Sequence, residues 1–212
     1  MGAGRFIVLE GVDGSGTTTQ CRLLAERLRA ERALVHTTAQ PSAGPVGSLL
    51  RLMLAGRVLG AGHQSPAWNE LALLFAADRV DHLDSEILPN LREGLYVICD
   101  RYDHSSVAYQ SVSGDGPETI AWIRELNRFA RRPDLTIVLD VPPAVAAARR
   151  RARSGRAEIF DAGPLQARLC AFYAALEQHF AGEPIVHIDG ARPVDEVATA
   201  VLAAVLALPP RS

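Results

Sequence analysis

A glycine-rich segment directly after an apolar run is the feature that most constrains the fold of this chain. The run FIVLE (6–10) leads into GVDGSGTTTQ (11–20), and a helical pattern begins at about residue 17. Glycines at this spacing let successive backbone N–H groups point at phosphate oxygens, with a helix N-terminus behind them. The order of strand, glycine-rich turn and helix therefore predicts a phosphate-binding loop.

Thr17 stands where the loop pattern G-x-x-x-x-G-K-[ST] has its lysine, and Thr18 falls on the position whose hydroxyl meets Mg²⁺. The chain has no lysine anywhere, because all 22 of its Lys+Arg positions are arginine. Loss of one charge-assisted contact costs about 1.5–3 kcal/mol. We expect Mg²⁺ and an arginine to take over at the outer phosphates. A glycine-rich turn that binds nothing is the alternative.

Apolar runs bounded by turn signals alternate with helical patterns along the rest of the chain. We predict strands at 6–10, 33–38, 96–100, 135–141 and 184–189. We predict helices at about 17–31, 45–56, 66–91, 104–112, 117–130, 143–153, 162–180 and 193–207. Strands that are apolar nearly throughout indicate an α/β fold, with a parallel sheet covered on both faces. Ligands of such sheets bind beyond the carboxyl ends of the strands.

Composition excludes some classes of partner. A net charge of -2 and a pI of about 6.3 argue against a protein that coats nucleic acid or an anionic membrane. The longest apolar stretch, 197–208, is too short to cross a bilayer. The three cysteines are too few and too scattered for a disulfide framework, so we expect them to pack as small apolar residues. We expect one soluble, cytoplasmic domain over residues 1–212.

Asp100 and Arg101 follow the run YVIC and so stand at the carboxyl end of a predicted strand. A carboxylate beside a phosphate loop can hold Mg²⁺ directly or through water. The adjacent guanidinium can grip a phosphate with two donors. A buried structural salt bridge is the alternative interpretation of this pair.

Phe75 and Arg79 lie four residues apart in a helical pattern and so share one face. A ring and a planar cation on one face can stack on a nucleobase and bind its edge. By spacing alone, core packing for Phe75 and a solvated Arg79 would be favoured.

An arginine run ends the predicted helix 143–153 and flanks Ser154-Gly155, a plausible hinge. A mobile arginine-bearing segment can neutralise charge on a transferring phosphoryl group and exclude water. Most runs of charge are solvated faces, and that alternative stays open here. The run comprises Arg149, Arg150, Arg151, Arg153 and Arg156.

With these pieces placed, the chain resembles the thymidylate kinases of the nucleoside monophosphate kinase group over nearly all of its length. The matching segments are FIVLEGVDGSG, NELALLFAADR, ILPNLREGLYVICDRY, HSSVAYQ and LDVPPAVA. The resemblance implies a P-loop fold with a five-stranded parallel sheet, and a homodimer. It also implies transfer of the ATP γ-phosphoryl group to dTMP, giving dTDP for dTTP synthesis, with Mg²⁺.

The resemblance also implies roles for particular residues at the acceptor base. Phe75 would stack on thymine and Arg79 would bond its edge. Ser106 falls where a polar side chain meets the base, and Gln110 lies close behind it.

Further roles implied by the resemblance concern the sugar and the phosphates. Arg101 would hold the dTMP phosphate, Tyr109 would crowd the 2′ position, and Asp13 would accept from the 3′-hydroxyl. The loop expected to hold ATP comprises Gly11, Val12, Asp13, Gly14, Ser15, Gly16, Thr17 and Thr18.

Three departures from the family pattern bear on catalysis. The loop lysine is Thr17, and the family's Arg-Glu-Pro reads Ala39-Gln40-Pro41. Ile159 stands where an arginine often precedes the aromatic in the lid (about 149–161), which leaves Arg153 or Arg156 as the expected lid donor. These changes concern the catalytic rate more than dTMP binding.

The leading hypothesis is thus an active, Mg²⁺-dependent dTMP kinase whose catalytic residues are Asp13, Arg101, Arg153 and Arg156, with Thr18 and Asp100 as metal ligands. A nucleotide-binding protein without kinase activity is the second hypothesis. A kinase for another monophosphate or for a nucleoside is the third, and Arg101, placed for an acceptor phosphate, favours a monophosphate over a nucleoside.

Overall fold

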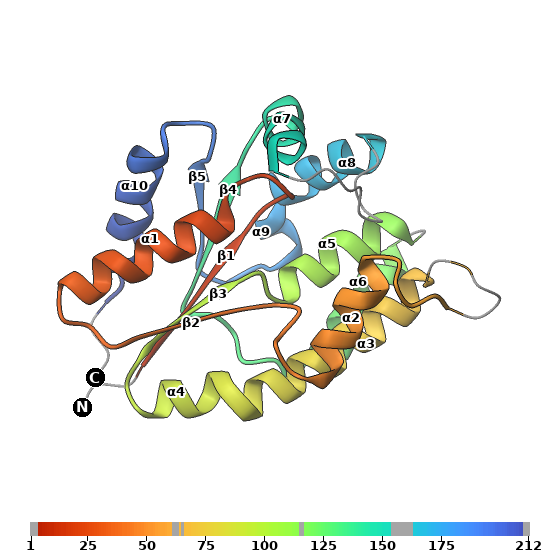
Figure 1. Cartoon of the computed structure of the whole chain (residues 1–212), viewed down its shortest axis with the longest axis horizontal. Helices are drawn as coiled ribbons and strands as arrows, with labels where there is room; N and C mark the ends of the chain where they lie inside the picture. The colour runs from red at the N-terminus through yellow and green to blue at the C-terminus, as the bar shows by residue number, and fades with distance from the viewer. Residues whose placement is uncertain (1–3, 61–63, 65, 115–116, 154–162, 210–212) are drawn as a thin grey trace.

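A five-stranded, wholly parallel sheet forms the centre of the molecule, as the strand pattern predicts (Figure 1). The computed structural model describes residues 4–60, 64, 66–114, 117–153 and 163–209. The order across the sheet is β2-β3-β1-β4-β5. The strands are β1 (Arg5–Glu10), β2 (Val35–Ala39), β3 (Tyr96–Asp100), β4 (Leu135–Asp140) and β5 (Ile185–Asp189).

Helices connect successive strands and cover both faces of the sheet. They are α1 (Thr17–Ala30), α2 (Pro45–Leu54), α3 (Trp68–His82), α4 (Leu88–Arg92), α5 (Asp103–Ser113), α6 (Pro117–Leu126), α7 (Pro143–Arg153), α8 (Gly163–Tyr173), α9 (Leu176–His179) and α10 (Val194–Leu206).

Two predicted helices are interrupted in the structure, and the one predicted at 117–130 ends earlier, at Leu126. The helix predicted at 66–91 contains a π-helical turn, η2 (Leu83–Ile87), between α3 and α4. Pro89 follows in the first turn of α4, where it has no N–H to donate to the preceding turn. The helix predicted at 162–180 is broken between α8 and α9, although alanine at 174 and 175 favours helix. Tertiary packing there overrides local propensity, since Leu176 is fully buried.

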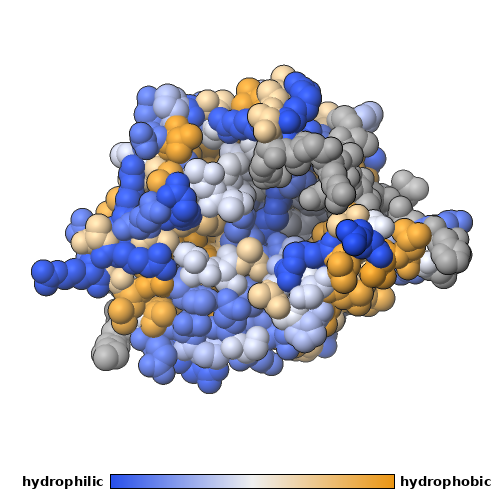
Figure 2. All heavy atoms as spheres, viewed as in Figure 1, coloured by the Kyte–Doolittle hydropathy of each residue, from blue (hydrophilic) through white to orange (hydrophobic). Residues whose placement is uncertain are grey.

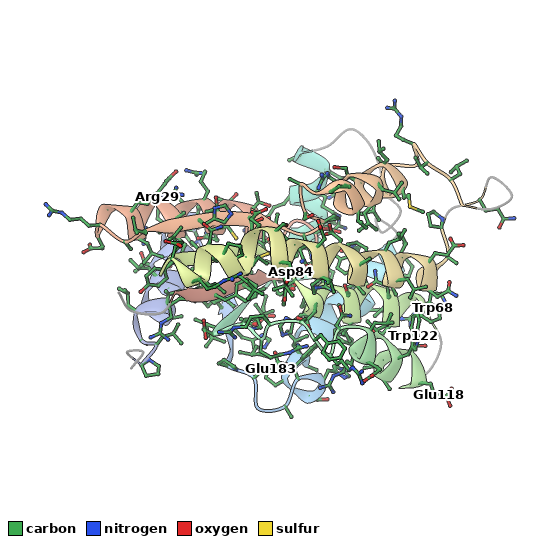
Figure 3. All side chains as sticks on the ribbon, turned by 90° about the horizontal axis from the view of Figure 1, so that it is seen from below. Arg29, Trp68, Asp84, Glu118, Trp122 and Glu183 are labelled. Atoms are coloured by element: carbon green, nitrogen blue, oxygen red, sulfur yellow. The ribbon has the colours of Figure 1, made fainter. Side chains whose placement is uncertain are left out.

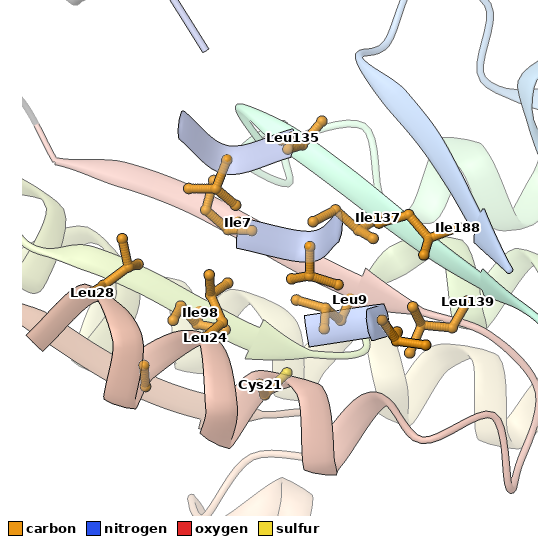
Figure 4. Close-up of a cluster of buried hydrophobic side chains, with 14 residues drawn as sticks. Ile7, Leu9, Cys21, Leu24, Leu28, Ile98, Leu135, Ile137, Leu139 and Ile188 are labelled. Carbon is orange, nitrogen blue, oxygen red and sulfur yellow. The ribbon is translucent and has the colours of Figure 1, made fainter. Parts of the chain in front are cut away.

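The alternation of side chains along β1 shows how the sheet is covered. Ile7 and Leu9 pack on the face covered by α1 and α10, with Leu24 between them and solvent (Figure 4). Phe6 and Val8 face the opposite side, against η2 and Tyr102. All four strand residues are fully buried, so both faces of β1 are core, as the apolar run predicts.

The three cysteines are free thiols, of which Cys21 and Cys99 are buried and Cys170 is half-buried. Burial raises the pKa of all three thiols, which is the behaviour expected of packing residues. None of the described helices has the length and apolar content needed to cross a membrane.

Helices α3 and α6 are held together at one end by an aromatic pair. Trp68 and Trp122 meet edge to face, with ring centroids 5.7 Å apart (Figure 3). This contact fixes α3, which carries Phe75 and Arg79, against α6 and α5. The pair therefore supports one wall of the site described next.

Candidate active site

The glycine-rich loop turns from β1 into α1 through backbone conformations that glycine adopts most easily. Gly14 and Gly16 have φ of 89° and 103°, and Gly16 caps α1 in the left-handed conformation. The loop closes with a bond from the Ser15 N–H to the Val12 carbonyl at 3.0 Å. The N-terminus of α1 therefore opens directly onto the loop, which is the arrangement that binds phosphate.

Thr18 and Asp100 meet beside this loop. Asp100 ends β3, the strand next to β1, and its Oδ2 accepts a 2.5 Å bond from Thr18 Oγ1. Asp100 Oδ1 is buried and has no hydrogen-bond partner within the described chain. A hydroxyl and a partly unsatisfied carboxylate are the oxygen donors that Mg²⁺ prefers, so these residues fit the expected metal site.

Arg101 turns back towards the loop from a strained backbone conformation. Its φ is 69°, a conformation uncommon outside glycine. Its guanidinium donates to the Gly11 carbonyl at 2.8 Å, to Asp13 Oδ1 at 2.7 Å and to Ser105 Oγ at 3.1 Å. Three fixed partners and backbone strain of order 1–3 kcal/mol mark a functional position.

Glu10 organises the entry to α5 and was missed by sequence reasoning, which placed it only as the last residue of a strand. Its carboxylate is fully buried and accepts bonds from the Tyr102 N–H at 2.8 Å, Ser105 Oγ at 2.6 Å and Tyr173 Oη at 3.0 Å. A charged residue ending an otherwise apolar strand was the available signal. This carboxylate fixes the first turn of α5 against β1.

A cavity of about 170 Å³ lies beside Arg101 and gathers most of the predicted acceptor residues. Tyr109 donates to Asp13 Oδ2 at 3.0 Å, and burial raises the pKa of Tyr109, so this hydroxyl stays protonated. The lining residues are Asp13, Gln40, Pro41, Leu54, Phe75, Arg101, Tyr102, Ser105, Ser106, Tyr109 and Gln110.

Arg79 lies one layer behind this cavity, where it is 1% exposed. Its Nη2 donates to Ser106 Oγ at 2.9 Å and its Nε to Gln40 Oε1 at 3.0 Å, while Nη1 bonds to Asn127 Oδ1. The solvated face that spacing alone favoured for Arg79 is therefore wrong. Gln40 and Asn127 were missed because their roles depend on contacts between distant segments.

The loop after β2 carries a positive charge despite Ala39 and Gln40. Arg51 of α2 donates to the Pro41 carbonyl at 2.9 Å and also bonds to the Ser42 carbonyl. Arg51 belongs to none of the motifs recognised in the sequence. Its guanidinium lines the same groove as Thr18 and Asp100, so a cation reaches this loop from another element.

Two arginines of α7 lie directly at the phosphate loop. Arg149 Nη1 donates to the Ser15 carbonyl at 3.2 Å, and Arg150 Nη1 donates to the Asp13 carbonyl at 2.7 Å. The lid donors favoured from sequence cannot be placed in the same way: the side chain of Arg153 and the whole of Arg156 lie outside the described part of the chain.

A buried charged network supports the first turn of α5. His104 lies 3.4 Å from Asp103 Oδ1 and 3.2 Å from Glu183 Oε2. Arg132 donates to Asp103 Oδ2 at 2.5 Å. Burial opposes charge on His104, but Asp103 and Glu183 outweigh it and raise the pKa of His104 above its ordinary 6.5. Burial also opposes ionisation of Asp103, yet His104 and Arg132 lower the pKa of Asp103.

This network predicts a pH-dependent stability. Because the pKa of His104 is higher in the folded protein than in the unfolded chain, protonated His104 stabilises the fold. This contribution is complete below pH 6.5 and is lost as the pH rises through the pKa of His104 in the folded protein. We expect the free energy of unfolding, measured by urea denaturation, to fall as the pH rises above 6.5, because only the folded protein stabilises the charged form of His104. His104→Gln should flatten this slope. Equal slopes in the two proteins would contradict the prediction.

A phosphate loop and a second pocket that meet at the carboxyl end of a five-stranded parallel sheet define a P-loop nucleoside monophosphate kinase. A family model described as thymidylate kinase matches residues 9–201, and the chain belongs to that family. It is an enzyme, an ATP-binding transferase of nucleotide biosynthesis.

Relatives resemble the chain over most of its length. A thymidylate kinase of Thermomicrobium roseum is 41% identical over 94% of this chain and 93% of its own. A probable thymidylate kinase of Pyrococcus abyssi is 40% identical over 87% and 88%. A thymidylate kinase of Gluconobacter oxydans is 41% identical over 76% and 74%. The fold, the family and the kinase activity predicted from the sequence are thus confirmed.

Proposed function

We propose that this single domain transfers the γ-phosphoryl group of ATP to dTMP without a loop lysine, using Mg²⁺ held by Thr18 and Asp100. The main support for this proposal is a hydrogen bond of 2.8 Å from the Arg101 guanidinium to the Gly11 carbonyl of the loop. Arg101 also lines the acceptor cavity. This bond ties the donor and acceptor sites together. Such transfer depends on positioning and charge neutralisation, so one missing cation can be tolerated.

The site offers separate binding groups for the donor phosphates and for the acceptor phosphate. The N–H groups of Gly14, Gly16, Thr17 and Thr18 bind the donor phosphates, and Arg101 holds the acceptor phosphate with two donors. Bound Mg²⁺ supplies charge neutralisation on the phosphate oxygens. Asp13, held by Arg101 and Tyr109, is placed to accept from the 3′-hydroxyl of the acceptor sugar.

Ser106 and Gln110 supply the hydrogen-bond pattern that thymine requires. Because Ser106 Oγ already accepts from Arg79, its proton remains for a ligand, and it suits the O4 carbonyl. Gln110 Oε1 is buried without a partner in the described chain and suits the N3–H. Cytosine offers an amino group where thymine has O4, so this pattern disfavours it. Phe75 completes the base site as the stacking ring.

Substitution of Ser106 tests this base recognition. We expect Ser106→Ala to lower kcat/KM for dTMP by about 10–100-fold, because it leaves buried polar groups unpaired. Discrimination against dCMP should fall with it. Ser111→Ala, on the same helix but bonded to the Ala108 carbonyl, is the matched control. Unchanged dTMP kinetics in Ser106→Ala would count against the assignment.

An ADP-release assay with ATP, Mg²⁺ and dTMP tests the function itself. We expect dTMP-dependent turnover, with dCMP and thymidine as poor acceptors. Binding of both nucleotides in calorimetry without product at high enzyme concentration would support an inactive binding protein instead. Faster turnover with another monophosphate would support a different acceptor.

We propose that the enzyme is a homodimer joined through α2 and α3. Leu52 of α2, and Leu73 and Val80 of α3, are 47%, 52% and 53% exposed. Leu73 and Val80 are two turns apart and share one face of α3. Figure 2 shows apolar side chains gathered over α2. Contiguous apolar surface of this kind is typical of an interface.

Charge placed on this surface tests the dimer. We expect Leu73→Glu to shift the mass measured by light scattering from dimer to monomer, since a carboxylate in an apolar interface is unpaired. Leu34→Glu, which also changes an exposed leucine but one that lies outside α2 and α3, is the control. A wild-type protein that is monomeric at high concentration would contradict the proposal.

A further inference from the structure

The loop cation that the lysine normally provides has to come from an arginine if the proposed function holds. Thr17 begins α1, is 6% exposed and carries no charge. The chain contains no lysine that could reach in from elsewhere. The guanidinium that replaces the lysine must lie at the phosphate loop, on the side that faces the acceptor phosphate.

Helix α7 packs directly on the phosphate loop. A Cβ added to Gly14, whose φ is 89°, would lie 2.5 Å from the Ala146 carbonyl oxygen and 3.2 Å from Arg150 Cγ. The Arg150 guanidinium continues over the loop, where Nη1 donates to the Asp13 carbonyl at 2.7 Å and to Gln166 Oε1 at 3.1 Å. Arg150 is thus held at a defined place on the loop.

Asp13 is the loop residue that joins the two substrate sites. Its main chain belongs to the loop, while its carboxylate accepts from Arg101 at 2.7 Å and from Tyr109 at 3.0 Å. Arg101, Tyr109 and Asp13 itself line the acceptor cavity. A guanidinium on the Asp13 carbonyl therefore lies where the loop approaches the acceptor.

Arg149 is anchored in a different direction. Its Nη1 bonds to the Ser15 carbonyl and to the Gly190 carbonyl, at 3.2 and 2.9 Å. Gly190 follows β5, at the edge of the sheet opposite to the acceptor helices. Of the two α7 arginines that bond to the phosphate loop, Arg150 is therefore the one directed to the acceptor side.

We infer that Arg150 is a catalytic residue that supplies the positive charge which Thr17 cannot give to the transferring phosphoryl group. An oxygen of the acceptor phosphate forms a bond to the γ-phosphorus as the bond from that phosphorus to the β,γ-bridging oxygen breaks. The electron pair of the broken bond leaves with ADP. The Arg150 guanidinium neutralises negative charge on the phosphoryl group during its transfer, as an arginine supplied in cis does in other phosphoryl transfers.

Charge exchange between positions 150 and 17 tests this inference in the ADP-release assay. We expect Arg150→Ala and Arg150→Gln to lower kcat about 10²–10³-fold, since each removes a charged donor. Arg150→Lys should retain more activity than Arg150→Gln. Thr17→Lys should raise kcat of the Arg150→Ala enzyme by about tenfold or more, yet change the wild type by less than about threefold. Arg151→Ala, an exposed neighbour on α7, is the control.

Two results would overturn the inference while leaving dTMP kinase activity in place. One is a kcat of Arg150→Gln within about threefold of the active wild type. The other is a pair of findings: Thr17→Lys does not raise the kcat of the Arg150→Ala enzyme, and Arg150→Lys is no more active than Arg150→Gln. Together these would show that Arg150 acts by holding the loop in place and not by its charge. If Thr17→Lys unfolds, the Lys and Gln variants at position 150 decide. A wild type without turnover overturns the proposed function and the inference together.

Discussion

Replacement of Arg101 by alanine should lower kcat/KM for dTMP by about 10²–10³-fold. The guanidinium is the acceptor phosphate ligand of the proposed site, and loss of one donor to transition-state charge costs about that factor. It also releases Asp13, which Arg101 binds at 2.7 Å. KM for dTMP should rise and kcat should fall in steady-state kinetics, while KM for ATP should change less.

Arg101→Lys separates charge from geometry in this test. Lysine keeps the charge but cannot reproduce the two-pronged grip of arginine, so its kcat/KM should lie between the wild type and Arg101→Ala. Thermal unfolding of each variant controls for loss of structure. An Arg101→Ala enzyme with wild-type kinetics would remove Arg101 from the acceptor site.

Removal of the Thr18 hydroxyl should have the second large effect. We expect Thr18→Ala to lower kcat by about 10²-fold and to raise the Mg²⁺ concentration needed for half-maximal rate, because one of two proposed metal-binding groups is lost. The hydroxyl lies 2.5 Å from Asp100 Oδ2, so Asp100→Asn should shift the Mg²⁺ dependence in the same direction. The measurement is a Mg²⁺ titration of the rate at saturating ATP and dTMP.

Thr18→Ser is the matched control, since it keeps the hydroxyl and removes only a methyl group. It should remain close to wild type in rate and in Mg²⁺ dependence. If Thr18→Ala and Thr18→Ser behave alike, the hydroxyl has no part in binding the metal, and the Mg²⁺ site lies elsewhere.

Much of the fold was predictable because its signals are local. The five strands appear as apolar runs bounded by turn signals, and the loop as a glycine-rich segment after the first of them. Each predicted strand lies within two residues of the observed one at either end. The break between α8 and α9 was not predictable, because alanine at 174 and 175 favours helix and only tertiary packing, in which Leu176 is buried, opposes it.

The candidate site likewise contains residues that could be predicted from the sequence and residues that could not. Asp13, Arg101, Ser106, Tyr109 and Gln110 were assigned by resemblance and line one cavity. Their catalytic and binding roles remain predictions for the experiments above. Glu10, which holds the start of α5, carries only the signal of a charged residue at a strand end, and Asp100, Asp140 and Asp189 share that signal.

The sequence alone determined the phosphate loop, the parallel α/β fold and the family, because glycine spacing and apolar periodicity act over a few neighbouring residues. Only the tertiary structure decided which arginine reaches the loop and what surrounds Arg79. The Arg150 contact with Asp13 spans 137 positions in the chain, and that of Arg79 with Asn127 spans 48. Such pairs exist only after the helices have packed on the sheet, so no pattern within a segment encodes them.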